Sequence, residues 1–257
     1  METIHERIVD WAEKYVPIFN ELSDKYNTYF YTQSPLNEIN APVDTMIIGI
    51  NPKGNLNGGG CSLSAEEYIS GNSSWYSRFD QNGKNQWNFN HGVRFFLGYD
   101  DYRHPESIDD DRKTVWTNLS PFESRNGSSD LRTKLMTEGV KSTLELIRIL
   151  SPKRIILLGV NAFEQLKRCL GGVDQCIEFS PVFSNIKSKI GRIYGIPTVC
   201  VPHPSRQWEV SNAFIPVFIY LHHLAEMTNK KDEMRPLKEI VQYMRHEMEL
   251  WQGRVEL

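Results

Sequence analysis

The stretch from Met46 to Gly54 constrains the fold of this chain more than any other. It begins with three apolar residues, two of them β-branched, and ends in the polar turn Asn51-Pro52. A short apolar run of this kind predicts a strand that is buried on both faces. Pro52 pushes the residue before it toward extended geometry, so we expect Asn51 at the carboxyl end of that strand. Open α/β folds place ligands at this edge, although an ordinary strand-to-loop turn would look the same.

A second segment, Thr198 to Arg206, repeats the arrangement about 150 residues later. An apolar β run again ends in a polar turn, and Pro202 and Pro204 fix the backbone on either side of His203. A single histidine after a strand is usually a packed side chain. The two prolines and the similar turn at Asn51 favour a functional role for His203.

These two segments resemble a known family. Gly49-Ile50-Asn51-Pro52 and His203-Pro204-Ser205 resemble the two signature motifs of the uracil-DNA glycosylase superfamily. Between them, Val115 to Leu119 resembles a third landmark, a strand ending in an asparagine that reads the base. The three motifs occur in the order of that superfamily, and the resemblance covers roughly residues 43 to 225.

The remaining pattern predicts an α/β fold. Apolar periodicity predicts strands at 44–50, 114–118, 154–159 and 196–201, and helices at 4–24, 131–150, 161–170 and 210–227. We expect a kink or break at Pro17, a capping box formed by Ser64 and Glu67, and an irregular stretch over 173–196 with a short strand at 190–194. The architecture expected is a three-layer α/β/α sandwich around a central four-stranded, mainly parallel sheet, with flanking N- and C-terminal helices. Residues 1–228 form one domain in this interpretation, and 229–257 form an amphipathic helical extension.

The resemblance implies a DNA glycosylase that hydrolyses the N-glycosidic bond of uracil or a related damaged base, after base flipping, in base excision repair. It implies that Asn51 positions the attacking water through its amide oxygen, because an amide is a poor proton acceptor. His203 would stabilise the negative charge that develops on O2 of the base. Asn118 offers a donor and an acceptor in one plane, which match O4 and N3–H of uracil and mismatch cytosine.

Further base contacts are implied for Gly49, Ile50 and an aromatic ring that stacks on the base. Phe79 is the ring we select, from a region that also holds Trp75 and Tyr76. Core packing is the alternative role for each of these rings.

The DNA contacts implied are those of Ser205, Arg206 and Lys53. Ser205 would hold a phosphate, and Arg206 would fill the space left by the flipped base or pair with a phosphate. Relatives with the asparagine form commonly have glycine directly after the proline, where this chain has Lys53. Lys53 therefore either contacts a phosphate or crowds the ring.

Composition limits the other possibilities. The chain has 257 residues, 40% of them hydrophobic, and no apolar run approaches the roughly 18 residues of a membrane helix. The N-terminus opens acidic and without an apolar signal core, so we expect a cytoplasmic protein with no membrane partner. The net charge of −3 counts mildly against nucleic acid, although basic residues gather near the site loops.

No cofactor and no metal are expected. The four cysteines form no CxxC pair, and their spacing does not resemble that of relatives with an iron–sulfur cluster, so reduced thiols are expected. The partner expected is DNA containing uracil or a damaged base, and the C-terminal helix offers a possible homodimer contact.

Two alternatives stay open. The same fold can serve as a non-catalytic module that binds a nucleobase or nucleic acid, or as another nucleotide-handling hydrolase. A metal bound by the acidic residues between 100 and 111 would favour the hydrolase.

Overall fold

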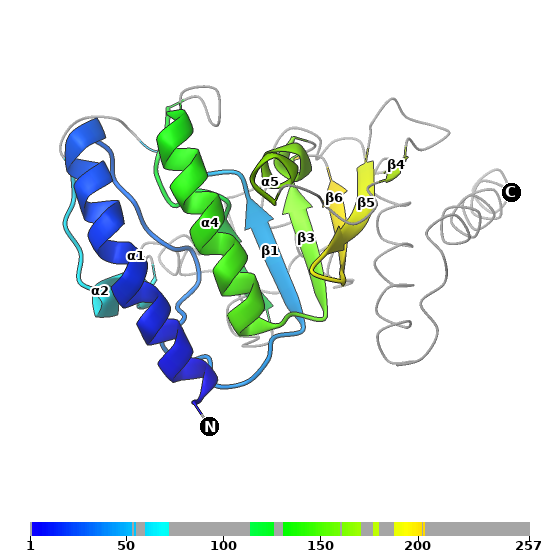
Figure 1. The fold of residues 1–257 in the computed structure, drawn as a ribbon, viewed down its shortest axis with the longest axis horizontal. Coiled ribbons are helices and arrows are strands. Elements are labelled where there is room, and N and C mark those ends of the chain that lie inside the picture. The colour runs from blue at the N-terminus through cyan, green and yellow to red at the C-terminus, as the bar shows by residue number, and fades with distance from the viewer. Residues whose placement is uncertain are drawn as a thin grey trace, which may run out of the picture.

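A single mixed sheet organises the computed structural model, which describes residues 2–52, 54, 60–71, 114–125, 131–159, 161–170, 177–179, 188–201 and 203. Its helices are α1 (Ile4–Tyr26), α2 (Ala65–Ile69), α4 (Thr133–Leu150) and α5 (Ala162–Leu170). Its strands are β1 (Thr45–Gly49), β2 (Thr114–Asn118), β3 (Arg154–Leu158), β4 (Ile177–Phe179), β5 (Ser188–Ile193) and β6 (Ile196–Val201) (Figure 1). The strand order is β2-β1-β3-β6-β5-β4.

The α/β class predicted from the sequence is confirmed, but the sheet has six strands where four were expected. The four strands predicted as central do pair in parallel, β1 with β2 and β3, and β3 with β6. β5 and β4 then add an antiparallel edge. The short strand expected at 190–194 corresponds to β5, but the prediction that the rest of 173–196 is irregular was wrong at β4. β4 has only three residues with Glu178 at its centre, and β5 contains Gly191 and two charged side chains, so neither shows the apolar run of a buried strand.

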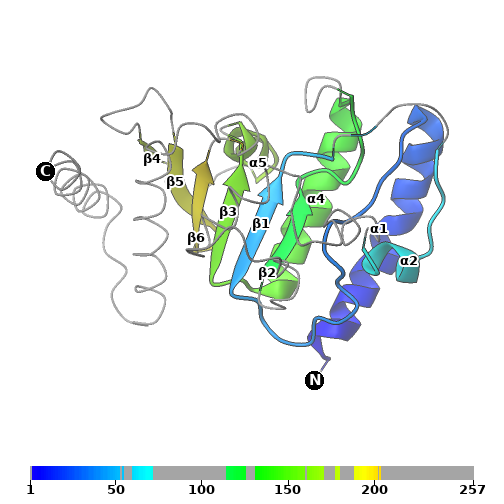
Figure 2. The same cartoon turned by 180° about the vertical axis from the view of Figure 1, so that it is seen from behind.

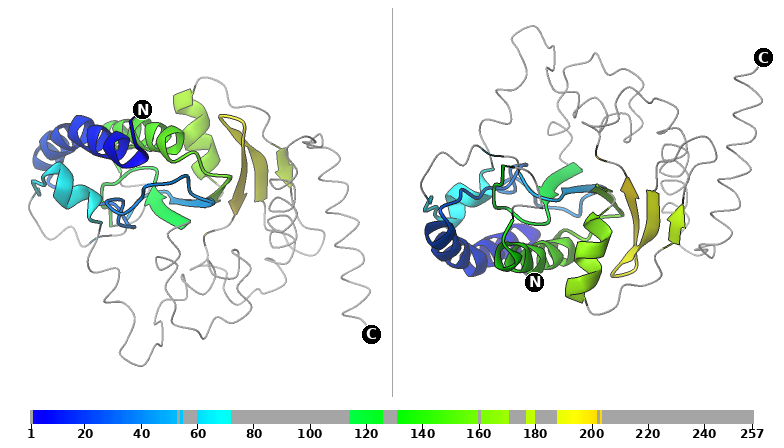
Figure 3. Two further views of the ribbon diagram at one scale, coloured as in Figure 1. Left: turned by 90° about the horizontal axis from the view of Figure 1, so that it is seen from below. Right: turned by 90° about the horizontal axis from the view of Figure 1, so that it is seen from above.

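Burial on both faces explains why β1 and β3 read as continuous apolar runs. Met46 and Ile48 belong to the core cluster that also includes the apolar faces of α1 and α4. Ile47 and Ile156 are buried too but lie outside that cluster, as expected for alternate residues that point to the opposite face. Figure 2 shows this second face, and Figure 3 shows that α1, α4 and α5 all lie on the first.

The long helix α1 lies beside α4 and closes the first face near β2. Thr3 and Glu6 form a capping box at its start, and it continues through Pro17, so the break considered at Pro17 does not occur. The indole nitrogen of Trp11 donates a buried hydrogen bond of 3.0 Å to the carbonyl of Ser142 in α4. The predicted capping box of Ser64 and Glu67 is confirmed at the start of α2.

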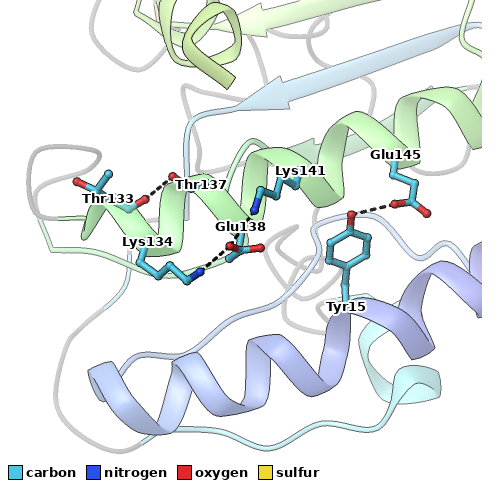
Figure 4. A network of polar contacts seen from close by, with 7 residues as sticks. All are labelled: Tyr15, Thr133, Lys134, Thr137, Glu138, Lys141 and Glu145. Carbon is cyan, nitrogen blue, oxygen red and sulfur yellow. Dashed lines mark hydrogen bonds and ion pairs between the residues drawn. The ribbon is translucent and has the colours of Figure 1, made fainter. Parts of the chain in front are cut away.

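Charged side chains of α4 bind one another and α1 (Figure 4). The Glu138 carboxylate accepts hydrogen bonds from Lys134 at 2.8 Å and Lys141 at 3.1 Å. The hydroxyl of Tyr15 in α1 donates to Glu145 at 2.8 Å. The Glu138 contacts lie within α4, whereas the Tyr15–Glu145 bond ties α4, the helix behind the loop that follows β2, to α1.

An aromatic cluster fixes the segment through Phe30 and the loop that follows β2. Phe19 of α1 lies 5.5 Å from Phe30 and 5.4 Å from Phe122, measured between ring centroids, and all three rings are buried. Phe30 and Phe122 also form an antiparallel bridge. The segment through Phe30 therefore lies beside the chain that follows β2, and the backbone at Phe122 is held by packing.

Several sequence predictions concern residues outside those described: the helix at 210–227, the extension at 229–257 and the acidic stretch at 100–112. Cys61 and Cys200 form no disulfide. In the part of the chain that the structure describes, no helix is both long and apolar enough to span a membrane.

Gly139 tests how closely α4 must approach the loop after β2. A Cβ at this position would lie 2.6 Å from Cα of Ser120 and 2.9 Å from the carbonyl oxygen of Leu119. Helix propensity alone predicts that Gly139→Ala stabilises α4 by about 1 kcal/mol. We expect the reverse, a loss of about 1–3 kcal/mol in the free energy of unfolding in urea, because the obstacle is backbone. Thr137→Ala, two residues away, is the matched control and should be neutral or slightly stabilising; a stabilised Gly139→Ala variant would contradict the close approach.

Glu138 gives a prediction about pH. Burial alone would raise the pKa of Glu138, but its hydrogen bonds to Lys134 and Lys141 outweigh burial and lower it. A carboxyl whose folded pKa is lowered stabilises the fold above its unfolded pKa of about 4.3, and this stabilisation is lost as the pH falls through the folded pKa. Both lysines are more than half exposed, so we expect Glu138→Gln to cost only about 1 kcal/mol at pH 7. The difference from the wild type should shrink below about pH 4. The exposed Glu13→Gln serves as the control, and a pH-independent loss would show that Glu138 acts through packing alone.

Candidate functional site

The candidate site lies where the four parallel strands end. β2, β1, β3 and β6 are neighbours in this order and point the same way, so Asn118, Asn51 and His203 all follow strand ends at one edge. From β1 the chain runs to β2 on one side, and it then crosses back to β3 on the other side of β1. The direction of the strand order therefore changes at β1, and open α/β sheets bind ligands at such a switch point. Three strand spacings, roughly 14 Å, separate the backbones of β2 and β6. A ligand that contacts both Asn118 and His203 must therefore lie across the ends of β1 and β3.

Asn118 and Gly49 are in close contact at this edge. They are opposite each other in the β1–β2 register, and the Asn118 side chain is 6% exposed. Its Oδ1 lies so close to Gly49 that a Cβ there would overlap it. Glycine at position 49 thus leaves room for the Asn118 carboxamide. Nδ2 of Asn118 is buried and has no hydrogen-bond partner within the described chain.

The amide nitrogen of Asn51 is held by three oxygen atoms. It donates to the carbonyl of Pro52 at 2.9 Å, the carbonyl of Phe122 at 3.4 Å and Oγ of Ser124 at 2.7 Å. Carbonyl oxygens only accept, so they require Nδ2 rather than Oδ1 on their side. Oδ1 is consequently directed away from this cluster, is buried, and has no partner among the described residues. It is a fixed, unoccupied acceptor.

The loop after β2 is braced so that these acceptors stay in place. The ladder to β1 continues past the strand, since Leu119 and Ser120 donate backbone hydrogen bonds to Gly49 and Ile50 at 2.8 and 3.0 Å. Oγ1 of Thr143 in α4 donates to the carbonyl of Asn118 at 2.9 Å. With the Phe122 ring packed in the aromatic cluster, both ends of the loop are anchored in the core.

The chain after β1 runs beside the same loop. Ser124 donates to the carbonyl of Pro52 at 3.1 Å, and Gly54 donates to the carbonyl of Ser124 at 3.2 Å. The Glu123 carboxylate lies against Gly54, where a Cβ would overlap it. Burial raises the pKa of Glu123, and a hydrogen bond from Tyr31 opposes this only in part.

The β3 and β6 side of the edge holds Gly159 and His203. Gly159 has φ = +107°, which favours glycine, and a Cβ there would lie 3.1 Å from Cδ1 of Ile50. The thiol of Cys200 donates to the carbonyl of Gly159 at 2.9 Å, which joins the ends of β3 and β6. His203 is the second residue after the end of β6 and is partly buried.

The structure thus places five of the predicted site residues at one edge: Gly49, Ile50, Asn51, Asn118 and His203. Lys53, Phe79, Ser205 and Arg206 lie outside the described residues, and their roles stay predictions.

The sequence did not identify Ser124, whose hydroxyl binds Asn51. It sits six residues after Asn118 in a stretch that reads only as a polar loop. The carbonyls of Pro52 and Phe122 carry no sequence signal at all.

Metal ligation has no support within the described ranges, where no three His, Cys, Asp or Glu side chains are grouped so as to hold an ion. The chain matches no protein-family model, and no curated protein matches it.

The three oxygen atoms around Asn51 require a side chain at this position that can donate hydrogen bonds, as an amide does. In Asn51→Asp the new carboxylate cannot donate to the two carbonyls, so its folded pKa should be raised above the unfolded value of about 3.9. A raised carboxyl pKa makes the fold less stable as the pH rises through it. We expect Asn51→Asp to lose about 1–3 kcal/mol in the free energy of unfolding at pH 8 and clearly less at pH 4. Asn51→Ala is the control, with a loss that does not depend on pH; equal losses for Asn51→Asp at both pH values would contradict the assigned amide orientation.

Proposed function

We propose that the chain is a DNA glycosylase that hydrolyses the N-glycosidic bond of uracil or a related damaged base. The observation that carries the proposal is the fixed orientation of the Asn51 amide, whose oxygen is buried and has no partner among the described residues, two residues after Gly49, which contacts Asn118. An acceptor of this kind suits a water molecule that must be positioned rather than deprotonated.

Base recognition is assigned to Asn118. Its Oδ1 would accept N3–H of uracil, and its unpaired Nδ2 would donate to O4. Buried polar atoms without partners carry a desolvation cost of about 1–3 kcal/mol each, which a matching base would relieve. Cytosine presents the reversed pattern and would leave these atoms unpaired, so the site should reject it strongly.

Charge stabilisation is assigned to His203. Cleavage leaves a cationic sugar and an anionic base, and the imidazole at the far end of the site would donate to O2 of the leaving base. The span from β2 to β6 supports a base held between Asn118 and His203, with Gly49 and Ile50 beneath it.

The finer architecture proposed with this activity is the three-layer α/β/α sandwich in a cytoplasmic protein that acts on DNA. Support for a third layer comes from the second face of the sheet. Trp116, Ile156 and Leu158 are buried there, although the described helices lie on the first face.

The test is base release from a uracil-containing oligonucleotide, single- and double-stranded, with abasic sites converted to strand breaks by alkali. We expect cleavage by the wild type and a loss of about a hundredfold or more in His203→Ala, because one preorganised donor is removed. Asn51→Ala should also lose activity. His5→Ala is the matched control, since His5 belongs to α1 near the amino ends of the strands (Figure 1).

Equal cleavage by wild type and His203→Ala would remove His203 from the mechanism and indicate a contaminating enzyme. Absence of cleavage with any damaged base, together with nucleobase binding that survives Asn51→Ala, would instead support the binding module. Absence of both would leave the nucleotide-handling hydrolase.

A further inference from the structure

Tyr29 exposes a large aromatic ring close to the candidate site. Its side chain is 42% exposed, and among the described residues Tyr194 is the other large aromatic side chain with this degree of exposure. Single exposed rings are common on protein surfaces, so exposure alone assigns no role. Tyr29 is distinguished by its position beside the site and by how firmly its backbone is held.

Three segments lie side by side at the outer end of the site. On one side, Ser124 donates a backbone hydrogen bond to the carbonyl of Pro52 at 3.1 Å. On the other side, Glu123 donates to the carbonyl of Tyr29 at 2.9 Å. Two strand spacings, roughly 10 Å, therefore separate the backbone of Tyr29 from the chain that carries Asn51. Tyr29 lies beyond β2, at the end of the site away from β6.

The backbone of Tyr29 is fixed although its ring is exposed. Its neighbours Thr28 and Phe30 are both buried, and the Phe30 ring packs in the aromatic cluster of the core. Oγ1 of Thr28 also donates to the carbonyl of Glu123 at 3.0 Å. A tyrosine on a rigid segment loses little conformational entropy when a ligand packs on its ring, because few side-chain torsions remain to be ordered.

The charges close to Tyr29 in these two segments balance one another. Asp24 and Lys25 precede Tyr29 in the chain and are exposed. On the paired segment, Glu123 is partly buried and Arg125 is exposed. These four residues carry two positive and two negative charges, so they supply little net attraction for phosphate. A nucleic acid that passes over this surface must gain much of its local affinity from contacts with a base.

We propose that the Tyr29 ring stacks on an unpaired base of the DNA strand that carries the target base. The inference rests on the proposed function, since the strand is taken to continue from a flipped base in the site. At roughly 3.4 Å per nucleotide of stacked strand, the ring is within reach of a base up to about three nucleotides from the target. Every base has a π-face, so this contact adds affinity without sequence preference. Flanking bases of a duplex are already paired and stacked, so the contact favours single-stranded DNA.

The first test measures binding and needs no cleavage. The probe is a fluorescein-labelled single-stranded oligonucleotide that carries one 2′-fluoro-2′-deoxyuridine, and Kd is measured by fluorescence anisotropy. We expect Kd to rise about tenfold in Tyr29→Ala, the loss typical of one stacked base, and to stay nearly unchanged in Tyr29→Phe, which keeps the ring. Tyr194→Ala is the matched control, because Tyr194 is similarly exposed but lies between β5 and β6, at the amino ends of the parallel strands. An equal Kd for the wild type and Tyr29→Ala would overturn the proposal.

The second test locates the stacked base. Each of about three nucleotides on either side of the target is replaced in turn by an abasic spacer, which keeps the phosphate but has no base to stack. One replacement should weaken binding by the wild type about tenfold and leave binding by Tyr29→Ala unaffected, because the ring and that base act as one pair. The same pattern of losses in both proteins would contradict a contact between them.

The stacking role and the proposed function fail in different ways. Tyr29→Ala should bind the matching duplex as well as the wild type does, and an equal loss on duplex and single strand would overturn the preference for an unpaired base. A wild type that binds the oligonucleotide through Tyr29 but releases no uracil would refute the glycosylase function alone. A wild type that releases uracil with the same KM as Tyr29→Ala would refute the stacking role alone.

Discussion

The parallel pairing of β1 on both of its edges is the constraint on which the rest of the structure depends. β1 is five residues long and fully buried, so its backbone groups must be satisfied by β2 and β3 and its side chains by two packed faces. This pairing aligns Gly49 with Asn118 and brings the ends of β2, β1, β3 and β6 to one edge. The aromatic cluster and α4 then fix the loop after β2 against the chain that leaves β1. The site is thus a consequence of strand register, braced from the core side.

The chemistry of that edge follows from which hydrogen-bond donors and acceptors surround Asn51 and Asn118. Two carbonyls and one hydroxyl select the amide nitrogen of Asn51, which leaves its buried oxygen without a partner among the described residues. Glycine at position 49 removes the side chain that would displace the Asn118 carboxamide. Both features cost stability, because buried polar atoms stay unpaired in the free protein. Sites that bind a specific polar ligand commonly accept such a cost, since the ligand supplies the missing partners.

The strands and helices with long apolar runs could be predicted closely from the sequence. β2 and β6 match their predicted bounds, and β1, β3 and α4 differ from theirs by one or two residues at an end. β4 and the antiparallel pairing of β5 were missed because short, charged strands take their stability from pairing with neighbours, which has no local signature. Asn51 and His203 were selected because each follows an apolar strand, and Asn118 because it ends a strand that resembles a landmark of the family. Ser124 was not, because its contact with Asn51 depends on which segments lie side by side, and only the tertiary structure shows this.

The central claim is that this edge holds a uracil between Asn118 and His203 with a water on Asn51. The most direct test is a crystal structure of the protein with an oligonucleotide that carries 2′-fluoro-2′-deoxyuridine, whose electronegative substituent disfavours the cationic sugar and so slows cleavage. The account predicts a flipped uracil with N3–H and O4 on Asn118, O2 near His203, and a water between Oδ1 of Asn51 and the anomeric carbon. A uracil that stays stacked in the DNA, or a base bound away from the ends of β1 and β2, would contradict it.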